Sequence, residues 1–299
     1  MANGFSLVDL KGLSEPITKL IDSVSKGIGV LYEPIAKVRN AKAEAASMYI
    51  LAEAKEKVDA LTYRALERVT HQEIRRQENI DTIVRGAVDY LPLEVSPVEV
   101  DSDWLVNFFN LGQDVSSAEM QSIWSKLLAG EVARPGSFKA RTLQTVKSMS
   151  VEEANLFTAL CGFSFVVGDD WALPMFSHEF FNFIRSNGLS TTEELHLKYI
   201  GLLSADVVYY GTFRSDGKIP LQYHSTQYLA HPEPADDFTV ETDGELVEEM
   251  DVEMDGAYIK AFPFTETGME LVSIAGGKPN LKYIKVLRKD GCIEPLRTK

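Results

Sequence analysis

Apolar side chains recur every three or four residues along the first part of the chain, which is the period of an amphipathic helix. Between residues 13 and 35 this pattern predicts one such helix, with Ser14 as its N-cap and Pro16 in its first turn. Pro34 is expected to end or kink it, because a proline inside a helix removes a backbone hydrogen bond. A much longer helix is predicted from residue 35 to about residue 90, where no proline interrupts a run of good helix formers.

The long helix carries a narrow apolar seam on an otherwise polar surface. Residues 36–89 contain ten basic and nine acidic residues, so the charge of this surface is nearly balanced. A helix of this composition is either mostly solvated or packs along one side against another helix. We therefore predict a coiled-coil-like helix through which the protein forms a homo-oligomer, with contact to a different protein as the alternative use of the seam.

The middle of the chain predicts a small helical bundle. Residues 91–100 contain two prolines and are expected to form a linker. Residues 101–165 hold four short amphipathic helices with polar turns between them, which is typical of a bundle. The expected N-caps of these helices are Ser102, Ser116 in a capping box with Glu119, Ser137, and Ser150 in a capping box with Glu153.

Large aromatic residues at helical spacing are expected in the core of this bundle rather than on a surface that stacks bases. They are Trp104, Phe108, Phe109 and Trp124. Pro135 and Gly136 are expected to stop the second helix and turn the chain.

The last part of the chain mixes helical and strand patterns. Helices are expected at residues 176–186, at about 190–201, after a cap at Thr265, and at residues 279–289. Strands are expected at residues 207–213 and 221–229, on either side of a turn at 215–217, and at 258–264. Helices followed by two or three strands and a capped helix indicate an α+β domain that is winged-helix-like.

These elements together predict an α+β fold that is mainly α. Residues 1–90 would hold the amphipathic helix and the long N-terminal helix, and residues 91–100 the linker. Residues 101–165 would form the small helical bundle, and residues 166–299 the winged-helix-like α+β domain.

Charge is concentrated in one stretch of the chain. The net charge of the 299 residues is −14, and residues 233–255 contain eleven acids and no base. This excludes a protein with a uniformly basic coat for nucleic acid. The stretch is interpreted first as a solvated loop or a charged edge strand, and alternatively as a dock for a basic partner.

Basic residues near the C-terminus recur at three- and four-residue spacing and would lie on one face of the last helix. Lys282, Lys285 and Lys289 are the candidate residues for contact with the phosphates of nucleic acid. Lys278 and Arg288 extend the same pattern. The alternative is an ordinary solvated helix face, and nucleic acid is the less favoured of the two interpretations.

The chain contains none of the local motifs of nucleotide-binding proteins, serine hydrolases or zinc proteases. No histidine has another histidine or a cysteine three or four residues away, so no metal site is predicted. His178 and Glu179 are the one adjacent acid–base pair, and a structural role is favoured for them. We therefore predict no catalytic residues, no cofactor and a protein that is not an enzyme, with an enzyme whose site is assembled from distant residues as the alternative.

The expected location is the cytoplasm, with a peripheral position at the inner membrane as an alternative. Two cysteines in a chain of this length are typical of a reducing compartment, and the N-terminus lacks a secretion signal. The longest uncharged run, residues 154–168, is too short to span a bilayer. Residues 13–35 could instead lie on an anionic membrane surface, with Lys19 and Lys26 on the polar side.

The segment 101–153 resembles a bacterial family classed only as a domain of unknown function, and it is also similar to abortive-infection Abi-alpha-type proteins. The residues that carry the resemblance are Asp103, Trp104, Leu105, Phe108, Phe109, Asp114, Val115, Ser116, Glu119, Met120, Gln121, Trp124, Leu128, Ala129, Gly130, Glu131, Val132, Pro135, Gly136, Ser137, Arg141, Thr142, Leu143 and Lys147. Gly12, Leu13, Ser14 and Pro16 fit the same family, as do Thr265, Gly268, Glu270 and Leu271.

The resemblance implies structural roles for these residues, since the family has no assigned catalytic residue. Glu131 and Arg141 are expected to pair across the turn between two helices and to lock it. Some relatives carry a membrane segment, which this chain lacks. A role in phage defence or in a stress response follows from the resemblance alone.

The sequence therefore predicts a non-enzymatic, self-associating interaction or effector protein. One alternative is a DNA-binding regulator that uses the winged-helix-like end. The other is a peripheral membrane effector that works through residues 13–35.

Overall fold

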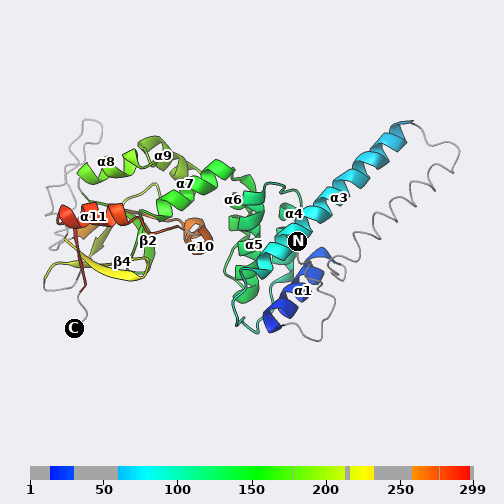
Figure 1. Cartoon of the computed structure of the whole chain (residues 1–299), viewed down its shortest axis with the longest axis horizontal. Coiled ribbons are helices and arrows are strands. Elements are labelled where there is room, and N and C mark those ends of the chain that lie inside the picture. Colours follow the sequence, from blue (N-terminus) through cyan, green and yellow to red (C-terminus); the bar gives the residue numbers. More distant parts are fainter. Residues whose placement is uncertain are drawn as a thin grey trace, which may run out of the picture. The chain divides into compact units, whose positions relative to one another are not determined.

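The computed structural model describes residues 14–29, 60–176, 178–212, 216–231, 258–275 and 277–296, and for residues 178–181 the backbone alone. The fold is α+β, as the sequence predicts, with a seven-stranded antiparallel sheet. Contacts divide the chain into two compact units, residues 1–149 and residues 150–299 (Figure 1). The division falls earlier than the boundary that the sequence suggested near residue 165.

The first unit is entirely helical in its described part. Its helices are α1 (Glu15–Ile28), α3 (Ala60–Val88), α4 (Ser102–Gly112), α5 (Ala118–Ala133) and α6 (Ala140–Ser148). Helix α3 packs against α5, α1 packs against α4 and α5, and α4 packs against α6. The bundle therefore includes α1 and part of the long helix, whereas the sequence assigned those segments to a separate N-terminal region.

Aromatic side chains from α4 and α5 form the centre of this bundle. Phe108 and Trp124 are fully buried and meet edge to face, with ring centroids 5.0 Å apart. Trp104 stacks on Phe108, and its indole N–H donates a hydrogen bond of 2.7 Å to the carbonyl of Phe138. These aromatic residues lie in the core, as their helical spacing predicts.

Three helices of the bundle begin with a different cap from the one predicted. Helix α6 starts after Lys139, whose side chain forms no cap hydrogen bond, rather than after Ser137. The carboxylate of Asp101, rather than the hydroxyl of Ser102, accepts the N–H of Trp104 at the start of α4. At the start of α5 the cap is Ser117, so the predicted capping box of Ser116 with Glu119 is wrong by one residue. Neighbouring polar side chains can each cap a helix locally, and the tertiary structure selects between them.

The segment predicted as a linker, residues 91–100, is held inside the first unit. The N–H of Ser96 donates to the carbonyl of Ala133 at the end of α5, at 2.8 Å. The carbonyl of Ser96 accepts a 2.6 Å hydrogen bond from the ammonium of Lys19 on α1. These contacts hold the segment against α5 and α1. The two prolines of the segment alone do not predict such contacts.

Helix α1 is shorter than predicted and is packed on its apolar side. It ends at Ile28, where Gly29 adopts the left-handed conformation that closes many helices, rather than at Pro34. Leu20, Ile21 and Val24 are buried in the bundle. The described part of α1 therefore leaves no apolar face exposed for a membrane surface.

The second unit combines helices with the sheet. Its helices are α7 (Val151–Cys161), α8 (His178–Ser186), α9 (Thr191–Tyr199), α10 (Glu266–Ala275) and α11 (Leu281–Lys289). Its strands are β1 (Phe165–Val167), β2 (Asp170–Met175), β3 (Val208–Gly211), β4 (Ile219–Tyr223), β5 (Thr226–Ala230), β6 (Tyr258–Pro263) and β7 (Ile293–Pro295). Helix α7 begins with the predicted capping box of Ser150 and Glu153, and it contacts α9 and α10.

The strand order β3-β6-β2-β1-β4-β5-β7 differs from the predicted arrangement. The expected strand 221–229 is two strands, because His224 and Ser225 turn the chain and His224 takes a positive φ of 49°. The expected hairpin around residues 215–217 does not form, since β3 pairs with β6. A seven-stranded sheet is larger than the two or three strands we expected, and the winged-helix-like arrangement is not confirmed.

Several sequence predictions lie outside the described residues. They are the acidic stretch, residues 233–255, the first part of the long helix, residues 35–59, the motif residues Gly12 and Leu13, Pro34, and the side chains of His178 and Glu179. Within the described ranges, no helix combines the length and the apolar character needed to cross a membrane.

Candidate functional site

The turn between α5 and α6 explains several residues of the family-like motif. Glu131 is only 1% exposed, and its two carboxylate oxygens accept the N–H groups of Gly136 and Phe138 at 2.6 and 3.0 Å. Gly136 has a φ of 88°, which favours glycine. Pro135 precedes Gly136 in the same turn. A buried carboxylate thus fixes the backbone of the turn.

Arg141 does not supply the partner that we expected for this carboxylate. Its side chain is exposed in the first turn of α6, and no ion pair joins it to Glu131 among the described residues. The backbone N–H groups of Gly136 and Phe138 bind the Glu131 carboxylate instead. Backbone donors near a carboxylate give no sequence signal, whereas an arginine ten residues away does.

Ser116 and Glu119 also have structural roles. The hydroxyl of Ser116 accepts a 3.2 Å hydrogen bond from the amide of Asn79 on α3. Glu119 accepts a 2.8 Å bond from the hydroxyl of Ser117. The pKa of Glu119 is lowered by its own backbone N–H and by this hydroxyl, since both favour the charged carboxylate. Both residues belong to the start of α5 and its packing.

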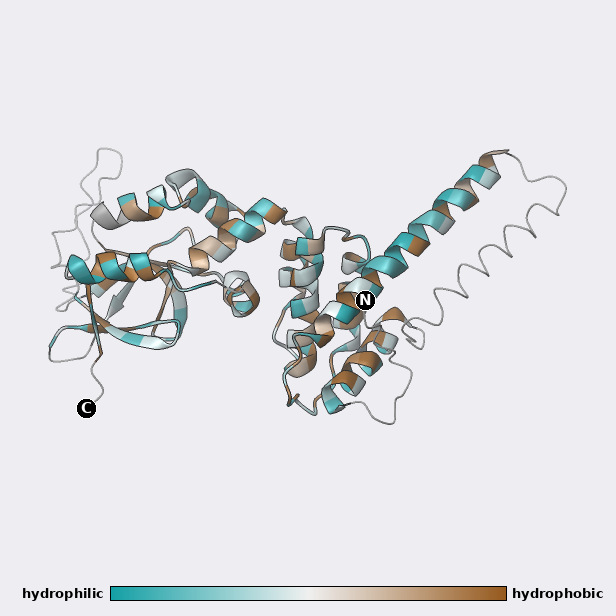
Figure 2. Ribbon diagram, in the orientation of Figure 1, coloured by the Kyte–Doolittle hydropathy of each residue, from teal (hydrophilic) through white to brown (hydrophobic). Residues whose placement is uncertain are grey.

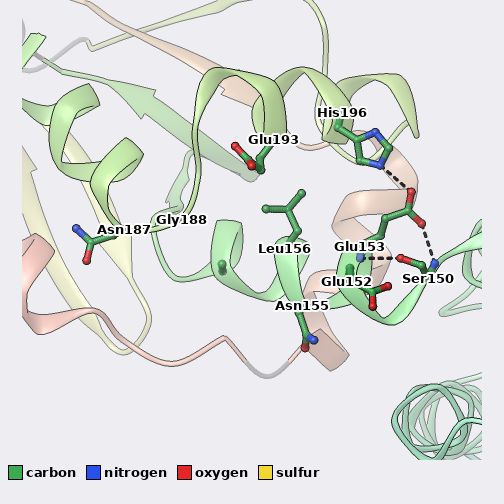
Figure 3. Close-up of a pocket in the computed structure, with 10 residues that line it drawn as sticks. Ser150, Glu152, Glu153, Asn155, Leu156, Asn187, Gly188, Glu193 and His196 are labelled. Carbon is green, nitrogen blue, oxygen red and sulfur yellow. Dashed lines mark hydrogen bonds and ion pairs between the residues drawn. The ribbon is translucent and has the colours of Figure 1, made fainter.

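A groove in the second unit, which the sequence did not indicate, lies between α7 and the segment from the end of α8 through α9 (Figure 3). Its volume is about 610 Å³. The lining residues are Ser150, Glu152, Glu153, Asn155, Leu156, Ala159, Asn187, Gly188, Glu193 and His196. It is therefore a polar groove with three carboxylates, two amides and one imidazole.

The polar groups at one end of the groove already bond to one another. The Nε2 atom of His196 lies 2.7 Å from one oxygen of Glu153, and the other oxygen accepts the N–H of Ser150 at 2.7 Å (Figure 3). The hydroxyl of Ser150 accepts the N–H of Glu153. The pKa of Glu152 is lowered by its own backbone N–H and by the Ser150 hydroxyl. These bonds fix the first turn of α7 to α9.

The groove does not bring together a nucleophile and a base. The hydroxyl of Ser150 is bonded to the helix start and not to His196. One oxygen of Glu193 is buried without a hydrogen-bond partner among the described residues, so it can accept an N–H donor. No group of three or more possible metal ligands occurs within the described ranges. Chemically, the groove suits a donor-bearing ligand, but most of its polar groups are explained by helix capping.

The two cysteines are separate free thiols. Cys161 is buried, and its burial raises the pKa of its thiol to about 12, so the thiol stays protonated at neutral pH.

We expect a thiol reagent such as DTNB at pH 8 to modify only Cys292 in the native protein and both thiols in denaturant. The Cys292→Ser variant should then show no reaction before unfolding; fast reaction of two thiols in the native chain would contradict the burial of Cys161.

Helix α11 carries the basic face predicted from the sequence. Its side toward the unit holds the buried residues Tyr283, Ile284 and Leu287. The exposed basic residues are Lys282, Lys285, Arg288 and Lys289, with Lys278 just before the helix. None of the five forms an ion pair with another described residue. We call these five residues the α11 cationic face.

Helix α3 carries apolar side chains at both ends of one side, separated there by the ion pair of Glu73 and Arg76, and only the C-terminal part of that side is buried. Its last two turns bury Ile80, Ile83, Val84 and Ala87. Toward its N-terminal end four large apolar side chains are exposed, on a helix that Figure 2 draws as mostly hydrophilic with separate hydrophobic segments up to that end. They are Leu61, Tyr63, Leu66 and Val69, with exposed fractions between 36% and 64%.

Comparison with known proteins identifies one family. The model of a family described as "Protein of unknown function (DUF2806)" matches residues 63–288. No curated protein and no solved structure matches the chain. The similarity to abortive-infection proteins has no support from these comparisons.

Proposed function

The chain belongs to the DUF2806 family of proteins of unknown function, and within that family we propose that it is a non-enzymatic interaction protein that self-associates through α3. The observation that carries this proposal is the set of exposed apolar side chains on the N-terminal half of α3. We call Leu66 and Val69, which share one side of the helix, the α3 apolar patch.

The α3 apolar patch lies on the same side of the helix as an interface within the first unit. Leu66 and Val69 lie 14 and 11 residues before Ile80, which is close to four and three helical turns. Both therefore fall on the side of α3 that buries Ile80 and Val84 against the bundle. Helix α5 covers the C-terminal half of this seam and leaves the N-terminal half as a surface on which another helix can pack.

A second copy of the same chain fits this surface better than a strongly charged partner. The described helix has five arginines and four acidic residues, so two copies meet without a large net repulsion. A twofold dimer uses the same patch on both copies, and apolar residues pair with apolar residues. A patch this small favours a reversible dimer rather than an obligate one.

The test is to place charge in the seam without weakening the helix. Leu66→Glu with Val69→Glu should keep the full chain monomeric, because burying two carboxylates in an apolar interface is costly. Sedimentation velocity from 1 to 100 µM would compare this variant with the wild type. Val106→Glu with Leu195→Glu is the matched control, since both residues are exposed apolar side chains outside the patch.

The control should associate as the wild type does. Unchanged association of the Leu66→Glu and Val69→Glu variant would show that another surface joins the copies. A loss of association in both variants would trace the effect to added charge and not to the α3 apolar patch.

We extend the proposal to an effector role in phage defence or a stress response, on the resemblance of residues 101–153 alone. Plaque counts on a bacterial host that expresses the chain would test this role. The membrane alternative through residues 13–35 has weaker support, because Leu20, Ile21 and Val24 are occupied in the bundle.

A further inference from the structure

We propose that the α11 cationic face binds the phosphate backbone of double-stranded nucleic acid. The face is formed by Lys278, Lys282, Lys285, Arg288 and Lys289. This property goes beyond self-association and depends on a different unit of the chain.

The fold presents these charges on one fixed side of the helix. Tyr283 and Leu287 are buried at 0% and 1% exposure and anchor α11 to its unit. Lys282, Lys285 and Lys289 follow at intervals of three and four residues, so they lie on one face along about 10 Å of helix. This spacing lets several ammonium groups reach neighbouring phosphates together.

The charges of the face are available for an external partner. None of its five residues forms an ion pair with another described residue, although the chain as a whole is acidic. Residues 233–255 supply eleven of the negative charges, and subtracting them from −14 leaves −3 for all other residues. The part of the chain outside that stretch is therefore close to neutral, and the α11 cationic face is a distinct positive region of that part.

A phosphate polymer suits the face better than a membrane does. Binding of an amphipathic helix to a bilayer needs an apolar side to insert, and that side of α11 is buried. Leu281 is the one large apolar residue of α11 that is strongly exposed. Rows of lysines without such an anchor bind phosphates as point charges, and they do so without reading the base sequence.

The salt dependence of binding gives a quantitative expectation. Each phosphate contact releases condensed counterions, so five contacts give a slope of about −4 to −5 in log K against log salt concentration. Binding should be measurable at low salt and lost near physiological salt. It should not distinguish between duplexes of different sequence.

The experiment is fluorescence anisotropy of a labelled 30-base-pair DNA duplex with the full chain at low salt. Lys282→Glu, Lys285→Glu and Lys289→Glu together should weaken binding at least tenfold. The charge-matched control replaces three exposed bases of the first unit, Arg85, Arg134 and Arg141, by glutamate, and it should weaken binding less than threefold. Equal losses in both variants, or no binding by the wild type at low salt, would overturn the proposal.

The acidic stretch, residues 233–255, allows a second, independent test of the proposal. The N–H of His231, the last described residue before it, donates to the carbonyl of Cys292 at 2.9 Å, three residues beyond Lys289. The eleven carboxylates follow His231 in the chain, and their negative charge lowers the affinity of the whole chain for phosphate. Replacing the acids of 245–255 by their amides should tighten DNA binding severalfold, and unchanged or weaker binding would count against the α11 cationic face as the site.

Anionic vesicles separate the two sources of phosphate. Vesicles of phosphatidylcholine and phosphatidylserine should not sediment the wild-type chain under the conditions in which the duplex binds. Sedimentation that depends on Lys282, Lys285 and Lys289, without duplex binding, would replace nucleic acid by a lipid surface and contradict the proposal. Thermal unfolding followed by circular dichroism confirms that each variant is folded.

Discussion

Replacing Glu131 by glutamine is expected to lower the free energy of unfolding of the helical unit by about 3 kcal/mol. The carboxylate is buried and accepts the N–H groups of Gly136 and Phe138, and hydrogen bonds to a charged acceptor contribute about 1.5–3 kcal/mol each. A glutamine keeps one acceptor oxygen but turns an NH₂ group toward the other N–H. One buried donor is then left without a partner.

Urea unfolding followed by tryptophan fluorescence measures this effect. Trp104 is a suitable reporter, because its indole N–H donates to the carbonyl of Phe138 in the same turn. Glu119→Gln is the matched control, since Glu119 is exposed and its carboxylate bonds to one hydroxyl. The control should change the stability by less than about 1 kcal/mol. If both variants unfolded at the same urea concentration, the Glu131 contacts would not stabilise the turn.

Replacing Gly268 by alanine should destabilise the second unit by about 3 kcal/mol. Gly268 is buried in the first turn of α10, where an added Cβ would lie 2.2 Å from the carbonyl oxygen of Leu202. That oxygen also accepts the N–H of Thr265, the residue that caps α10. Because the clash is with backbone, it cannot be relieved by a side-chain rotation, and overpacking of this kind costs about 1–3 kcal/mol or more.

Gly211→Ala is the control for this prediction. Gly211 lies in β3, and a Cβ there would meet no atom within 4 Å. Alanine should therefore leave the thermal midpoint of unfolding nearly unchanged, whereas the Gly268 variant should unfold several degrees lower. Similar midpoints for the two variants would show that α10 can move away from Leu202 at little cost.

The helices were predictable because their signals are local. Apolar spacing and polar caps placed α4, α5 and α7 within one or two residues of their positions in the structure. The capping box of Ser150 and Glu153 is confirmed in full. The predicted N-cap of α5 was one residue too early. The hydroxyl of Ser116 binds the amide of Asn79 on α3, and Ser117 caps the helix. Periodicity also does not say which core a helix joins, so α7 was assigned to the wrong unit.

The sheet was not predictable in the same way. Strand β6 pairs with both β2 and β3, from segments about 90 and 50 residues earlier in the chain, respectively. The turn at His224 has neither glycine nor asparagine to mark it. Strands β1 and β7 have three residues each, which is too short for an alternating pattern to stand out.

The candidate surfaces show the same contrast. The α11 cationic face could be read from three- and four-residue spacing, since a helix sorts such residues onto one side. The groove could not, because Glu153 and His196 are 43 residues apart and meet only when α7 and α9 pack. The seam of α3 was predicted, but the half that stays exposed is decided by where α5 ends against it.

Self-association through α3 is tested most directly by light scattering of the wild-type full chain over a range of concentrations. The expected mass is 33.3 kDa in dilute solution and rises toward twice that value near 100 µM. The chain with Leu66→Glu and Val69→Glu should remain at 33.3 kDa throughout. A wild-type mass of 33.3 kDa at every concentration would contradict a self-associating protein and leave the α3 apolar patch for a different partner.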